Sequence, residues 1–142
     1  MRWLDRILLR RPPEPLRAVP AVRRQKNYSA ESGYAYEYFY DGLRDTAGVR
    51  LHYFTVSGDR KTWFQTSVSV PDSGILAWQQ MHGRPLADNE RYGIAKLALF
   101  AAFDQRETPA AMRDPVVVTP GQVVDLLDRK STRLNSSHIT IS

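Results

Sequence analysis

The sequence predicts an α+β domain in which a small antiparallel sheet of three to four strands packs against one central apolar helix. Three observations carry this prediction. Residues 89–107 are apolar around most of a helical circumference. Successive segments between residues 34 and 70 alternate apolar and polar side chains with the period of a strand, and turn residues separate them. The expected order of elements is α-βββ-αα-β-α.

The N-terminal arm, residues 1–26, is the most basic part of the chain. It carries eight basic and two acidic residues, a charge of +6. A short amphipathic helix is expected over Met1–Arg11, because its apolar side chains fall on one face and Pro12-Pro13 ends it. Residues 14–26 contain two further prolines and little periodicity, so we expect a linker there.

The aromatic segment after the arm predicts the first strand. Its tyrosines occupy alternate positions and therefore share one face: Tyr34, Tyr36, Tyr38 and Tyr40. Asp41-Gly42 and the residues from Asp45 to Gly48 are expected to form turns.

Two more strands are expected over Val49–Ser57 and Thr62–Val70, joined by a hairpin loop at Gly58–Lys61. The second of them alternates most clearly. It places Phe64, Thr66, Val68 and Val70 on one face and polar side chains on the other, which predicts one buried and one solvated face.

Two helices are expected next. Asp72 is expected to cap a short helix that ends at Gly83, because glycine adopts the left-handed conformation without strain. Asp88 is expected to cap the central helix, which Thr108-Pro109 ends. Only a narrow polar stripe that includes Lys96 interrupts its apolar surface, so it must be covered on more than one side.

A fourth strand and a last helix complete the prediction. Val116–Val118 is a short β-branched run. Thr119 then has the composition of an N-cap, with Pro120 at the first helical position and Gln122 three residues after the cap.

The final segment, Asp128–Ser142, reads DRKSTRLNSSHITIS. It resembles, residue for residue, the translation of a short-read sequencing adapter, so we expect it to be non-native and the true C-terminus to be missing. The native chain is then an arm, residues 1–26, followed by a single α+β domain, residues 27–127. Without the tail, 17 basic and 14 acidic residues remain, and residues 27–127 carry −3 against the +6 of the arm.

Composition narrows the class of protein. There is no cysteine, which excludes disulfides and cysteine-ligated metals. No apolar run approaches the roughly 20 residues needed to span a bilayer. Asp5 and Arg6 interrupt the N-terminal apolar segment, so it does not resemble a signal peptide. A soluble, cytoplasmic protein is expected.

Catalytic patterns are missing from the sequence. His52 and His82 are the histidines outside the tail, and no HExxH motif, GxSxG elbow or glycine-rich phosphate loop accompanies them. We therefore assign no catalytic residue, no metal ligand and no cofactor, and favour a non-enzymatic role. The alternative is a small enzyme of unrecognised type with its pocket between sheet and central helix.

The basic arm admits three hypotheses. It docks back onto the acidic body, contacts an acidic protein partner, or lies on an anionic membrane with Trp3 inserted. We favour the protein partner. The residues expected to make this contact are Arg2, Trp3, Arg6, Arg10 and Arg11.

The tyrosine row admits two hypotheses. Tyr36, Tyr38 and Tyr40 form a stacking platform for single-stranded nucleic acid, helped by the arm. Alternatively, most of the row packs in the core with hydroxyls at the rim.

The segments YSAESGYAYEYFYDG and WQQMHGRPLADNERYGIAKLALFAAFD resemble small bacterial proteins of unknown function. The resemblance covers roughly residues 27–104 and implies a bacterial source. It assigns no functional residue.

Overall fold

The computed structural model describes residues 15–129. In chain order the elements are β1 (Lys26–Ser29), β2 (Ala35–Thr46), β3 (Val49–Ser57), β4 (Phe64–Pro71), α2 (Asp72–His82), α3 (Asp88–Gln105), the 3-10 helix η1 (Pro109–Arg113) and β5 (Val116–Val117). Residues 120–129 form a further helix, here named the C-terminal helix. The α+β class and the central apolar helix are confirmed.

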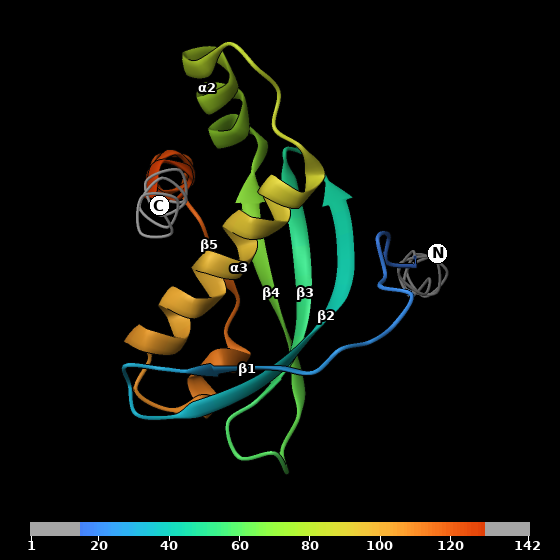
Figure 1. The fold of residues 1–142 in the computed structure, drawn as a ribbon, viewed down its shortest axis with the longest axis vertical. Helices are drawn as coiled ribbons and strands as arrows, with labels where there is room; N and C mark the ends of the chain where they lie inside the picture. The colour runs from blue at the N-terminus through green and yellow to red at the C-terminus, as the bar shows by residue number, and fades with distance from the viewer. Residues whose placement is uncertain (1–14, 130–142) are drawn as a thin grey trace, which may run out of the picture.

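The sheet has five strands in the order β1-β2-β3-β4-β5 and curls around α3, which lies across one face (Figure 1). Neighbours from β1 to β4 are antiparallel, whereas β5 runs parallel to β4 through the pair Val68–Val116. The prediction of a purely antiparallel sheet of three to four strands was therefore wrong. α2, α3 and η1 separate β4 from β5, which gives the chain room to cross over to a parallel neighbour.

β1 is the strand that the prediction omitted. Its four residues, KNYS, contain no alternating apolar pair, and the polar positions are exposed. Pairing with β2, in which Lys26 lies opposite Tyr38, decides its conformation. A strand set by its partner rather than by its own composition leaves no local pattern to detect.

β2 continues through Asp41-Gly42, where a turn was expected. The register shifts between Tyr40 and Gly42, which marks a β-bulge, and Gly42 has φ +132°. A Cβ on Gly42 would lie 2.7 Å from the carbonyl oxygen of Arg17, so this position also needs glycine for close backbone approach. The bulge bends the strand instead of ending it. The turn expected before Val49 is present, with Gly48 at φ +77°.

The described part of the arm lies on the sheet edge. Arg17 and Leu43 exchange both backbone hydrogen bonds, at 2.8 and 2.9 Å. The Arg17 guanidinium also pairs with the Asp45 carboxylate. Residues 15–26, expected as a linker, therefore follow β2. The helix expected over Met1–Arg11 lies outside the described residues.

The core is the layer between α3 and the sheet. α3 buries Ile94, Ala95, Ala98, Leu99, Ala102 and Phe103. The alternating face predicted for β4 is confirmed, because Thr66, Val68 and Val70 are buried and Gln65 is exposed. The C-terminal helix adds buried Val123 and Leu127, so α3 is covered from more than one side, as its apolar circumference requires.

Helix boundaries differ from the prediction by one residue at two N-termini. The N-caps are Pro71 for α2 and Ala87 for α3, so Asp72 and Asp88 are the first helical residues. An acidic side chain in the first turn still stabilises the positive end of the helix. Gly83 ends α2 with φ +65°, as expected.

The cap of the C-terminal helix is confirmed. The backbone N–H of Thr119 donates to the Gln122 Oε1 at 2.8 Å, and the Gln122 N–H donates to the Thr119 hydroxyl at 3.3 Å. This reciprocal pair is a capping box. The adapter-like segment contributes Asp128 and Arg129 to this helix, and the rest of it lies outside the described residues.

Candidate functional site

The residues expected to bind ligands divide into two groups in the structure. The arm residues Arg2, Trp3, Arg6, Arg10 and Arg11 lie outside residues 15–129. The tyrosines of β2 face α3: Tyr36 is 0% exposed, Tyr38 is 2% exposed, and Tyr40 is half-buried.

Tyr36 and Tyr38 pack in the core. The ring of Tyr36 stacks on Phe103 at 4.0 Å between centroids, and Tyr38 meets Phe54 and Phe100 edge-on. Burial is the main cause that raises the pKa of the Tyr36 phenol, and burial together with Tyr92 raises the pKa of Tyr38 to about 12. Rings enclosed in this way offer no free face on which a base could stack.

A cavity of about 330 Å³ opens beside the outer end of the tyrosine row, and we call it the tyrosine pocket. Its walls come from the segment before and at the start of β1, from β2, and from the first turns of α3. The lining residues are Pro20, Val22, Arg24, Lys26, Tyr38, Tyr40 and Tyr92. Three aromatic rings and two cationic side chains therefore share one small cavity.

The seam between β1 and α3 determines where this pocket lies. Tyr92, Lys96 and Phe100 occupy successive turns of α3 and point to one side of the helix. Tyr28 of β1 closes the seam, because its ring stacks on Phe100 at 4.2 Å and its hydroxyl donates to Asp104 at 2.8 Å. At the opposite end of β1 lies Lys26, which lines the pocket.

A buried histidine holds one wall of the pocket. The Tyr40 hydroxyl lies 2.9 Å from Nδ1 of His52, and the Tyr40 ring meets Tyr92 edge-on at 4.7 Å. His52 is 1% exposed. Burial, assisted by the guanidinium groups of Arg50 and Arg91, lowers the pKa of His52 to about 4, so the imidazole is neutral near pH 7.

Two lysines meet beside these rings without a counter-ion. Burial and the nearby Lys26 ammonium lower the pKa of Lys96, whose ammonium also lies 5.8 Å from the centre of the Phe100 ring. Within residues 15–129, no carboxylate forms an ion pair with either lysine. Like charges that approach each other without a carboxylate are unfavourable unless a ligand neutralises them.

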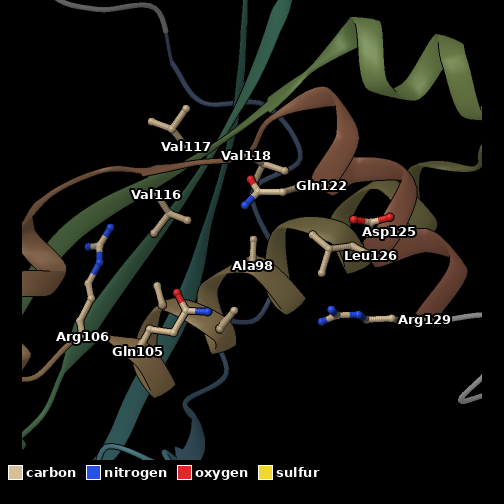
Figure 2. A pocket seen from close by; sticks show the side chains of 12 residues that line it. Ala98, Gln105, Arg106, Val116, Val117, Val118, Gln122, Asp125, Leu126 and Arg129 are labelled. Carbon is tan, nitrogen blue, oxygen red and sulfur yellow. The ribbon is translucent and has the colours of Figure 1, made fainter.

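A second cavity, about 410 Å³, lies between α3, β5 and the C-terminal helix (Figure 2). Ala98, Ala101 and Ala102 form its floor, and Val117 of β5 is exposed at its edge. The guanidinium of Arg106 at its rim already donates hydrogen bonds to three backbone carbonyl oxygens. These belong to Ala111 in η1 and to Asp114 and Pro115 just after it. The groove therefore has an apolar floor, and its walls also carry the polar side chains of Gln105, Asp125 and Arg129 (Figure 2).

Comparison of the chain with protein-family models, with curated proteins and with solved structures gives no match. The site must therefore be interpreted from its own chemistry.

The two histidines lie in different surroundings, because His52 is buried in β3 and His82 is exposed near the end of α2. His82 stacks on Trp78 at 4.3 Å and lies 3.8 Å from Asp128, on an exposed part of α2. No cluster of three potential metal ligands occurs in the part of the chain that the structure describes. None of the helices between residues 15 and 129 is long and apolar enough to cross a membrane.

The sequence analysis named Tyr38 and Tyr40 but missed Arg24, Lys26, Tyr92 and Lys96 as their neighbours. One pattern could have indicated the helical pair, because Tyr92 and Lys96 stand four residues apart on a helix that is otherwise apolar. No local pattern could have indicated Lys26, which the unpredicted strand β1 brings to the site.

Proposed function

We propose that this protein is a binding domain that takes an acidic segment of a partner protein across residues 20–26 and the tyrosine pocket. The observation that carries the proposal is the shared cavity, in which Arg24 and Lys26 stand beside the rings of Tyr38, Tyr40 and Tyr92. Such a combination of aromatic walls and cationic rim suits a polypeptide that presents both carboxylates and apolar atoms.

Exposed aliphatic side chains beside the tyrosine pocket support a protein as its ligand. Val22 lines the pocket and is 65% exposed, and Val19 next to it is exposed as well. Exposed aliphatic side chains beside unpaired cations are typical of a contact surface rather than of an ordinary solvated face. The arm therefore contributes both charge and apolar area.

The acidic-protein hypothesis is favoured over single-stranded nucleic acid by the burial of the tyrosine row. A platform for successive bases requires a row of open aromatic faces, and Tyr36 and Tyr38 are enclosed in the core, so only the single pocket at Tyr40 and Tyr92 remains open. It is favoured over an enzyme because, among residues 15–129, no carboxylate contacts the Tyr40–His52 pair, and Nε2 of His52 is buried without a hydrogen-bond partner.

The test is a titration of the full chain with short acidic peptides, followed by backbone amide NMR. We expect saturable shifts at Val22, Lys26, Tyr40 and Tyr92, and no such shifts with a peptide of the same length in which lysine replaces each acidic residue. Oligothymidylate in low salt serves as the competitor, because tighter binding of the oligonucleotide would replace the proposal by the nucleic-acid alternative.

Two double variants test whether the cations of the pocket, rather than the net charge of the protein, bind the acidic peptide. Arg24→Ser with Lys26→Ser removes two cations from the pocket, and Lys61→Ser with Arg113→Ser removes two exposed cations elsewhere. The first pair should weaken acidic-peptide binding about tenfold or more, since the groups contact the ligand directly. Equal weakening by both pairs would reduce the effect to net charge and overturn the proposed surface.

A further inference from the structure

We infer that the tyrosine pocket selects one aromatic side chain of the acidic segment, and that the carboxylate of an adjacent residue bridges the ammonium groups of Lys26 and Lys96. This inference rests on the proposed function and specifies its ligand. Charge complementarity determines the occupant, because Lys26 in the pocket wall and Lys96 one turn after Tyr92 form no ion pair with a carboxylate of residues 15–129.

The two ends of the β1–α3 seam differ in charge. At one end, Asp104 of α3 accepts hydrogen bonds from the Tyr28 hydroxyl at 2.8 Å and from the Glu31 backbone N–H at 2.9 Å. Two turns earlier on the same helix, the Lys96 ammonium lies 5.8 Å from the centre of the Phe100 ring, which stacks on Tyr28. Lys26 lies two residues before Tyr28 in β1, so the two lysines share the pocket end of the seam. At its closed end the seam thus joins an acceptor to two donors, whereas at the pocket end it brings two positive charges to the same place.

Two other cations of the arm, Arg17 and Arg23, are paired with acids. Arg17 pairs with Asp45, and Arg23 donates to Asp41 at 3.1 Å while it stacks over the Phe39 ring. Arg24, Lys26 and Lys96 form no ion pair among residues 15–129, so the unmatched cations of this edge gather at the pocket. Local conflicts of this kind are concentrated at functional sites.

The aromatic walls of the tyrosine pocket are held in place by their neighbours. Tyr40 is held by His52, and Tyr92 stands edge-on to it, so two rings keep a fixed mutual geometry. Aromatic ligands gain both stacked and edge-to-face contacts in such a site. Among residues 15–129, the hydroxyls of Tyr38 and Tyr92 have no hydrogen-bond partner, whereas those of Tyr28 and Tyr40 do. Two phenol groups are therefore available to a polar ligand atom.

The volume of the tyrosine pocket limits the size of its ligand. Pockets for small molecules span roughly 300–1,000 Å³. At about 330 Å³ the tyrosine pocket is at the lower end of this range, which suits one large side chain better than an extended ligand. The rest of the segment would then lie outside, against Val22 and Arg24.

The experiment compares acidic peptides that differ in one central residue, tryptophan, leucine or alanine, with binding measured by calorimetry on the full chain. We expect tryptophan to bind roughly tenfold or more tightly than alanine, as for a buried anchor residue, with leucine between them. A second tryptophan peptide with glutamine in place of the acidic residues next to the anchor should lose most of this affinity.

Lys26→Met and Lys96→Met test the bridge. Each should weaken the tryptophan peptide with acidic neighbours and leave the glutamine version nearly unchanged. The double variant should lose less than the combined losses, because either single change already removes the bridge. Lys61→Met is the matched control, and thermal unfolding shows that each variant is folded.

The outcomes separate the two proposals. Equal affinity for the tryptophan and alanine peptides, or unchanged affinity in Lys96→Met, would overturn the aromatic-anchor inference and leave acidic-segment binding intact. Failure of every acidic peptide to bind would overturn the proposed function itself, and the inference with it.

Discussion

The hydroxyl of Tyr40 lies 2.9 Å from Nδ1 of His52, and this contact joins a wall of the tyrosine pocket to a buried position in the middle of β3. Nε2 of His52 is buried without a hydrogen-bond partner among the described residues. The imidazole thus positions the phenol of Tyr40 and is itself kept neutral by burial. The same residue should make the fold sensitive to acid.

We predict that stability falls as the pH is lowered from 7 to 5. The folded-state pKa of His52, about 4, lies below the unfolded value of 6.5, so the unfolded chain binds more protons in this window. The contribution of neutral His52 to the free energy of unfolding is fully present above the unfolded-state pKa of 6.5. It is lost as the pH falls toward the folded-state pKa of about 4. The loss between pH 7 and 5 should be about 2 kcal/mol in urea unfolding.

His52→Gln should remove most of this pH dependence, and His82→Gln, at an exposed position, should leave it in place. Equal slopes of stability against pH in the parent and His52→Gln would show that other groups cause the effect.

Replacing Lys96 by methionine should stabilise the unliganded protein. The change removes the repulsion with Lys26 and keeps an aliphatic stem over Phe100. A gain of about 0.5–1 kcal/mol is expected, as for relief of a like-charge contact in a partly buried seam. Lys61→Met should change stability little. A loss of stability in Lys96→Met would mean that the two lysines are not in conflict.

Gly74 should not tolerate alanine. A Cβ at Gly74 would lie 2.7 Å from the Cβ of Val123, where α2 meets the C-terminal helix. The expected cost of about 1–3 kcal/mol from this overlap exceeds the gain of at most about 1 kcal/mol from replacing a helical glycine. Chemical denaturation measures the difference.

Gly121 is the matched control for Gly74, because its Cβ would meet nothing within 4 Å. Gly121→Ala should be neutral or slightly stabilising. In a Val123→Gly background, Gly74→Ala should cost less than in the parent, since the obstructing Cβ and its methyl groups are gone. An equal cost in both backgrounds would locate the strain elsewhere.

Arg106 should be needed to hold η1 and β5 against the end of α3. Its guanidinium donates to the carbonyls of Ala111, Asp114 and Pro115 at 2.9, 2.7 and 3.1 Å. Arg106→Met should cost about 1–3 kcal/mol, because three carbonyls lose a charged donor. Hydrogen exchange at Val118, whose N–H bonds to Ser69, should become faster.

Arg113→Met provides the comparison, because Arg113 makes only a contact over the Phe64 ring at 4.4 Å among the interactions of residues 15–129. It should cost less than Arg106→Met. Identical costs for the two changes would argue that the carbonyl contacts contribute little.

Local periodicity was sufficient to predict much of this fold. The apolar circumference of α3, the alternation of β4 and the Thr119–Gln122 cap all follow from side chains a few residues apart, and the structure confirms each. Periodicity could not separate a turn from a bulge at Asp41-Gly42, because both use glycine with positive φ.

The sequence by itself determined the strands β2 to β4, the helices α2 and α3, and that the tyrosines share a face, since these depend on the chain's own period. Only the tertiary structure decided that this face lies under α3, that β1 joins the edge of β2, and that Lys26 meets Lys96. Residues far apart in the chain come together through burial of the common core and through strand pairing. Those interactions leave no trace in the local order of residues, and the tyrosine pocket is their product.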